Sequence, residues 1–107
     1  MNGLTQQQKD RISRLSKQIS TAKDEVWYAF ETTMMSDAKS FVYELWSAVK
    51  DDEDIPASIK KDLFSILDTA RSYLIGEGTT YDRSQKAHAE LAVAERYLKD
   101  ILAQDTE

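Results

Sequence analysis

The stretch VWYAFETTMMSDAKSFVYELWSAV, residues 26–49, decides the fold, because it holds both tryptophans and most of the other large apolar side chains. Read as a helix, it carries one continuous apolar stripe. The stripe consists of Val26, Phe30, Met34, Ala38, Phe41, Leu45 and Val49. The residues that widen the stripe are Trp27, Met35, Val42 and Trp46. A helix this apolar needs two surfaces, its own core and either another layer of the fold, a second subunit or a partner protein.

The composition indicates a helical protein without metal or cofactor chemistry. The chain has 107 residues, with 3 glycines and 1 proline, too few for a turn-rich β fold, so the predicted class is all-α. It has no cysteine and 1 histidine, which excludes a disulfide framework and a thiolate metal site. No apolar run has the length of a signal peptide or a membrane span. We therefore expect a soluble, cytoplasmic protein that does not act at a membrane.

Apolar residues recur at helical spacing along the chain and predict a single helical domain, residues 1–107, folded as an antiparallel bundle. The expected three long helices cover about 5–50, 56–75 and 79–104. Two β-branched residues, Thr32 and Thr33, precede Ser36, a residue type that caps helices. We therefore favour a break near residues 33–36, which makes four helices. Their expected ranges are about 5–33, 36–51, 56–75 and 79–104.

Single residues mark the expected helix boundaries. Thr5 is an N-cap for the first helix, and Thr79 or Thr80 is an N-cap for the last. Pro56 opens the preceding helix and Gly76 ends it. The boundaries therefore follow from local chemistry.

The last helix has small residues on its apolar face. Ser84, Ala87 and Ala94 alternate there with larger side chains and leave room for bulk opposite them. The large side chains of residues 26–49 could fill that room. We therefore predict that the last helix packs on residues 26–49.

Charge is distributed unevenly along the chain, whose net charge is −5. Residues 24–54 carry nine acidic groups against Lys39 and Lys50, and residues 1–23 are basic apart from Asp10. The basic groups of this first segment are Lys9, Arg11, Arg14, Lys17 and Lys23. Opposite charges could simply help antiparallel helices pair. Nucleic-acid binding by the basic N-terminal helix is an alternative, but its cations spread around the helix without an aromatic residue among them.

The acidic segment supports a second interpretation, imitation of phosphate charge at a partner's nucleic-acid site. The candidate residues for such an acidic surface are Asp37, Glu44, Asp51, Asp52, Glu53 and Asp54. The acidic run also precedes a helix, whose N-terminus favours negative charge. Because it lacks the spaced ligands and the glycine of a calcium-binding loop, we predict no metal site there.

Arg83-Ser84-Gln85-Lys86-Ala87-His88 has the form R-x4-H, which resembles the motif of the HEPN superfamily. Members of that superfamily are helical bundles, and many are metal-independent ribonucleases that act as dimers. The resemblance implies that His88 would be the general acid or base and that Arg83 would stabilise negative charge in the transition state. On one regular helix, however, the two side chains point roughly 140° apart. A HEPN-like ribonuclease is therefore the alternative function.

The absence of any other catalytic motif favours binding over catalysis. We expect a small non-enzymatic regulator of another protein, such as an inhibitor, an immunity or antitoxin-like factor, an adaptor or a chaperone, of the size common among phage and plasmid accessory proteins. Large aromatic residues dominate interface energetics. The candidate partner-binding residues are Trp27, Tyr28, Met35, Tyr43, Trp46 and Phe64. We also predict a homodimer built on residues 26–49, with the apolar seam of the first helix as the alternative interface.

Overall fold

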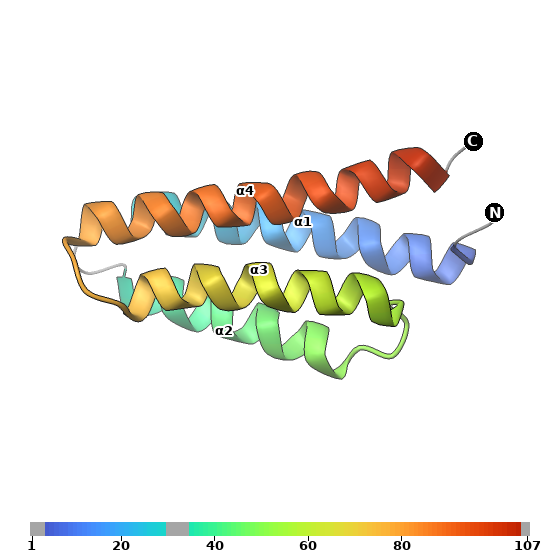
Figure 1. Ribbon diagram of the computed structural model, residues 1–107, viewed down its shortest axis with the longest axis horizontal. Helices are drawn as coiled ribbons and strands as arrows, with labels where there is room; N and C mark the ends of the chain where they lie inside the picture. The colour runs from blue at the N-terminus through green and yellow to red at the C-terminus, as the bar shows by residue number, and fades with distance from the viewer. Residues whose placement is uncertain (1–3, 30–34, 106–107) are drawn as a thin grey trace.

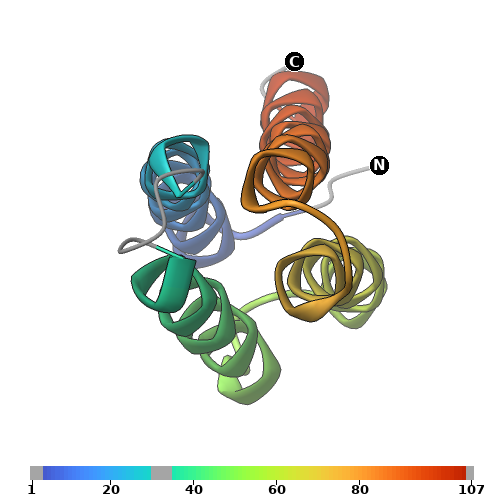
Figure 2. The same cartoon turned by 90° about the vertical axis from the view of Figure 1, so that its left-hand side faces the viewer.

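A computed structural model describes residues 4–29 and 35–105 and consists of antiparallel α-helices joined by short connections (Figure 1). The helices are α1 (Gln6–Tyr28), α2 (Met35–Asp51), α3 (Ala57–Ile75) and α4 (Thr80–Asp105). Viewed along the bundle, they occupy the corners of a square in chain order (Figure 2). The predicted all-α antiparallel bundle is confirmed.

The first predicted helix is two helices. α1 ends at Tyr28, where Ala29 is the C-cap and its N–H donates a hydrogen bond to the carbonyl of Val26 at 3.0 Å. α2 starts at Met35. A continuous helix over residues 5–50 is therefore excluded, and the described residues form four helices. Of the expected break, residues 33 and 34 lie outside the described residues, as do Thr32, Phe30 and the remaining residues between 30 and 34.

The helix boundaries follow the expected capping chemistry. The hydroxyl of Thr5 accepts a hydrogen bond from the backbone N–H of Gln8 at 3.1 Å, and the Gln8 side chain accepts one from the N–H of Thr5 at 2.9 Å. Thr79 caps α4, because its hydroxyl accepts a hydrogen bond at 3.0 Å from the backbone N–H three residues later. Pro56 and Gly76 bound α3. All four of these sequence-based boundaries are confirmed.

One continuous core runs between the helices, and α4 packs most extensively against α1 and α3. α2 packs against α3 and, less extensively, against α1, so α2 and α4 are diagonal to each other (Figure 2). The prediction that the last helix packs on residues 26–49 is therefore wrong for the part of that stretch in α2. Only residues 26–28, at the end of α1, belong to a helix beside α4. The break after α1 is the physical reason, because it places α2 beside α3.

The helices of the bundle differ in length. α1 and α4 have 23 and 26 residues, whereas α2 and α3 have 17 and 19. The long pair lies side by side and both extend past α2 and α3 at the end where the termini lie (Figure 1). Within the described ranges, no helix is both long and apolar enough to cross a membrane.

Candidate functional site

Three aromatic side chains meet where α2 lies against α3. The rings of Tyr43 and Trp46 are 5.9 Å apart between centroids and nearly parallel, at 25°. Phe64 of α3 approaches Trp46 from the other helix, with ring centroids 5.8 Å apart. Tyr43 and Trp46 share one face of α2 because they are three residues apart. This local geometry gathers three of the six candidate partner-binding residues in one place.

Cations cover these rings. The guanidinium carbon of Arg71 lies 4.9 Å from the ring centroid of Tyr43 and 5.8 Å from that of Trp46. The ammonium of Lys50 lies 5.4 Å from the Trp46 ring. Each such cation–π contact stabilises by about 0.5–1 kcal/mol at an exposed site. We call this surface the aromatic–basic seam. It comprises Lys39, Tyr43, Trp46 and Lys50 of α2 and Phe64, Arg71 and Ile75 of α3.

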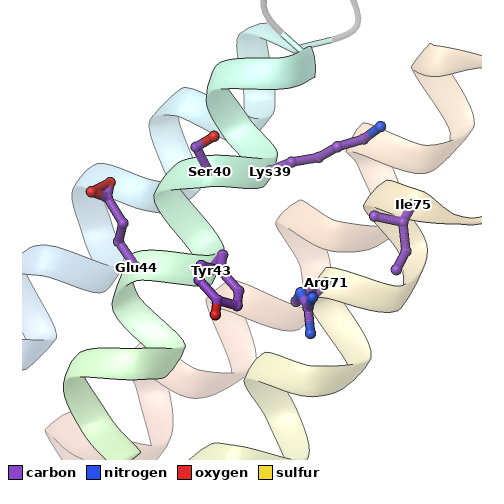
Figure 3. Close-up of a pocket in the computed structure, with 6 residues that line it drawn as sticks. All are labelled: Lys39, Ser40, Tyr43, Glu44, Arg71 and Ile75. Atoms are coloured by element: carbon purple, nitrogen blue, oxygen red, sulfur yellow. The ribbon is translucent and has the colours of Figure 1, made fainter.

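The seam contains an open depression of about 420 Å³. Its lining residues are Lys39, Ser40, Tyr43, Glu44, Arg71 and Ile75 (Figure 3). Lys39 reaches from α2 toward α3, whereas Glu44 extends from the opposite side of α2, away from Arg71 (Figure 3). Tyr43 is 47% exposed and Ile75 is 57% exposed. The depression therefore combines accessible apolar surface with two cationic groups.

The other candidate partner-binding residues lie elsewhere. Met35 is only 6% exposed and belongs to the core, so its prediction as a surface residue is wrong. The break before α2 is the reason, since it puts Met35 on the first turn of α2, facing inward. Trp27 and Tyr28 are exposed at the end of α1. Trp27 contacts His88 of α4, with ring centroids 4.9 Å apart, and is not part of the seam.

Part of the acidic run is engaged in holding the fold together. The side chain of Asp52 is 8% exposed and forms an ion pair with Arg11 of α1, whose Nε lies 2.6 Å from a carboxylate oxygen. The carboxylate of Asp54 accepts a hydrogen bond from the side-chain amide of Gln7 at 3.0 Å. These two acids tie the α2–α3 connection to α1. Because the side chain of Asp52 is little exposed and is paired, Asp52 does not contribute to the predicted acidic surface. The candidates that remain exposed are Asp37, Glu44, Asp51 and Glu53.

The basic N-terminal segment is also partly neutralised within the bundle. Besides Arg11, Lys23 is paired: its ammonium donates a hydrogen bond to Glu95 of α4 at 2.7 Å. This hydrogen bond holds the pKa of the Glu95 carboxyl below its usual range, although burial acts in the opposite direction. Arg14 and Lys17 remain exposed on α1. The Arg11–Asp52 and Lys23–Glu95 ion pairs thus tie the basic segment to other parts of the bundle, which leaves fewer of its cations for nucleic acid.

The two residues of the R-x4-H motif serve different helices. Arg83 donates a hydrogen bond to the carbonyl of Leu74, at the end of α3. His88 packs against Trp27 of α1 instead. Burial lowers the pKa of His88, and the nearby ammonium of Lys23 lowers it further. Each side chain has a structural contact of its own, and in the described part of the chain no contact joins Arg83 to His88.

Sequence reasoning missed the cations of the seam. Lys39, Tyr43, Trp46 and Lys50 follow the spacing of one helical face, and this spacing could have revealed them. Their partner Arg71 lies on another helix, where its spacing of seven residues from Phe64 and four from Ile75 places it on the same flank as these two residues. Among the described residues, no group of three or more His, Asp or Glu side chains could hold a metal ion.

Comparison of this chain with protein-family models, with curated proteins and with solved structures found no match. The comparisons therefore add nothing to the resemblance of the R-x4-H motif to the HEPN superfamily. Functional inference depends on the chemistry of the chain's own residues, and above all on the aromatic–basic seam.

Proposed function

We propose that this chain is a small non-enzymatic protein that regulates another protein by binding it through the aromatic–basic seam. The observation that carries the proposal is the stack of Arg71, Tyr43 and Trp46, with centroid distances of 4.9 Å and 5.9 Å, on a surface open to solvent. Tryptophan, tyrosine and arginine are the residue types that most often dominate the energetics of protein interfaces. An inhibitor, an immunity or antitoxin-like factor, an adaptor or a chaperone would each act by this kind of contact.

The mutual contacts of these side chains also support binding. Each ring or cation in the stack is held by its neighbours, so it loses little conformational freedom when a partner arrives. Trp46 and Phe64 are half-buried, which anchors the seam to the core, while Tyr43 remains 47% exposed. A pre-organised surface of this kind converts more of its contact energy into affinity.

A capture experiment with single-residue variants tests the proposal. Immobilised wild-type protein is expected to retain a specific partner from the lysate of the source cell, and Trp46→Ala to lose about 2 kcal/mol of affinity, roughly thirtyfold. Trp27→Ala is the matched control, because Trp27 is also a partly exposed tryptophan, 41% exposed, but lies outside the seam. Circular dichroism establishes that both variants fold. Equal retention by all three proteins, or no specific retention by any, would contradict the proposal.

A homodimer built on residues 26–49 stays a prediction. The seam includes α2, so a second copy could cover the same surface as a foreign partner. Light scattering distinguishes the cases, since a monomer has a mass of 12.2 kDa. A monomer at micromolar concentration would remove the dimer and leave the seam free for a partner.

A further inference from the structure

We infer that the partner presents an acidic, amphipathic segment to the seam, with carboxylates at Lys39 and Arg71 and an apolar side chain against Tyr43 and Ile75. The inference rests on the proposed function and adds the chemistry of the partner. It concerns the end of the seam that contains the depression of about 420 Å³. Charge, the geometry of the guanidinium and the exposed apolar surface each support it.

The seam cations have no counter-ion among the described side chains, in contrast to the two paired cations of α1. Among the side chains that the structure describes, Lys39, Lys50 and Arg71 form no ion pair, whereas Arg11 and Lys23 do. The net charge of the protein is −5, but Lys39, Lys50 and Arg71 bring positive charge to the α2–α3 seam. A carboxylate-bearing segment would supply the missing counter-charge.

Arg71 is placed to bind a carboxylate in two-pronged fashion. Its guanidinium lies over the rings of Tyr43 and Trp46, at 4.9 Å and 5.8 Å from their centroids, which fixes its position without using its N–H donors. Those donors match the two oxygens of a carboxylate. Lys39 lines the same depression and adds a second positive charge, whereas Glu44, which also lines it, extends from the opposite side of α2, away from Arg71 (Figure 3). This end of the seam therefore favours a planar carboxylate.

Apolar surface lies next to these cations. Ile75 is 57% exposed and Tyr43 is 47% exposed, and both line the depression (Figure 3). An isoleucine so exposed at the end of a helix gains from being covered, at about 25 cal/mol for each Å² of apolar surface buried. A segment that carried only carboxylates would leave this surface in water, so the fitting segment is amphipathic.

Acidic residues of the chain itself argue against a nucleic acid on this surface. Asp51 to Asp54 follow Lys50 directly, and Asp51, the last residue of α2, lies about 18 Å from Lys39 along the helix at 1.5 Å per residue. A uniformly charged phosphate backbone along the seam would meet this acidic end, whereas a peptide can confine its carboxylates to the Lys39 end. Bases would also compete with Arg71 and Lys50 for the ring faces.

Fluorescence anisotropy with labelled probes tests the inference. The probes are a helical peptide of about 15 residues, or roughly four turns, built from Glu and Leu, its twin with Gln for every Glu, and an oligothymidylate. Wild-type protein is expected to bind the Glu peptide at least about tenfold more tightly than the Gln twin, with an affinity that falls as salt rises from about 0.05 to 0.3 M.

Charge-removing variants locate the site. Lys39→Gln combined with Arg71→Gln is expected to lower the affinity for the Glu peptide by more than about tenfold. Arg71→Lys keeps the positive charge but loses the planar pair of N–H donors, so it should lower this affinity less. Arg14→Gln combined with Lys17→Gln removes two exposed cations from α1 and is the matched control.

The outcomes separate this inference from the proposed function. Equal binding of both peptides, no binding of the Glu peptide, an unchanged affinity in the Lys39 and Arg71 variant, or tighter binding of the oligothymidylate through the same cations would overturn the inference. If a partner is nevertheless captured in a Trp46-dependent manner, the proposed function stands without it. A Glu peptide that binds through Lys39 and Arg71 supports the inference even before a cellular partner is identified.

Discussion

Basic side chains have different partners in the α1–α4 pair and in the α2–α3 pair of this bundle. Between α1 and α4, basic side chains find carboxylates within the protein, as Lys23 does with Glu95 at 2.7 Å. Between α2 and α3, Arg71 and Lys50 lie on aromatic rings and form no ion pair among the described side chains. Lys23 of the first pair is thus neutralised within the protein, whereas Arg71 and Lys50 of the second pair can still bind an external carboxylate.

Side-chain size contributes to the difference. α4 buries the small residues Ser84, Ala87 and Ala94, each 0% exposed, and helices with small residues at their contact approach closely. The α2–α3 seam instead has Trp46 and Phe64 at its edge, half-buried and reaching the surface. Large rings at a helix boundary spread the contact outward, so α1 and α4 form the scaffold and α2 with α3 the accessible surface.

The largest expected effect is on the scaffold. Leu91 of α4 is 0% exposed, so Leu91→Ala removes buried methyl groups and leaves a cavity, and should lower the free energy of unfolding by about 2–5 kcal/mol. Urea denaturation followed by circular dichroism measures the change. Val93→Ala on the same helix, where Val93 is 51% exposed, should change stability by less than about 0.5 kcal/mol. Similar losses in the two variants would show that α4 is not packed as described.

Neutralising one cation in each pair of helices compares them directly. Lys23→Gln leaves the carboxylate of Glu95, 12% exposed, without its principal partner, and should lower the free energy of unfolding by about 1–2 kcal/mol. Arg71→Gln removes only cation–π contacts and should lower it by less than about 1 kcal/mol. The two variants are measured by the same denaturation. A larger loss for Arg71→Gln would reverse the assignment of scaffold and accessible surface.

The ion pair of Glu95 also predicts a pH dependence. The hydrogen bond from Lys23 lowers the pKa of Glu95 in the folded protein, so below the unfolded pKa of 4.5 the unfolded chain binds the proton more readily. The stabilisation from this group is therefore complete above that value and is lost as the pH falls toward the folded pKa. Wild-type protein should lose more stability between neutral and acidic pH than Glu95→Gln. Parallel stability curves for the two proteins would contradict this.

The smallest expected effect concerns the aromatic pair of the α1–α4 half, Trp27 and His88. Burial lowers the pKa of His88 below 6.5 in the folded protein. The stabilisation from the neutral His88 ring is therefore present above pH 6.5 and is lost as the pH falls toward the folded pKa. In a Trp46→Phe variant, quenching of Trp27 fluorescence reports protonation of the ring 4.9 Å away. The midpoint should lie below 6.5, and the additional substitution His88→Gln should abolish the transition. A midpoint above 6.5 would exclude the described burial.

The candidate site was only partly predictable. Tyr43, Trp46 and Phe64 were predicted as binding residues from their type, and the structure brings them together. Met35 was predicted with them and lies in the core. Residue type and period identify large apolar side chains, but they do not reveal which of them a neighbouring helix will cover. Arg71 escaped prediction because its contacts to Tyr43 and Trp46 cross from one helix to another.

The sequence by itself determined the helical class and most helix boundaries, because capping and periodicity act over a few neighbouring residues. Thr5, Pro56, Gly76 and Thr79 therefore stand where local chemistry requires. Only the tertiary structure decided that α2 lies diagonal to α4 and that Arg71 meets the α2 aromatics. Both outcomes depend on contacts between segments far apart in the chain, and their relative placement is set by the packing of all four helices together.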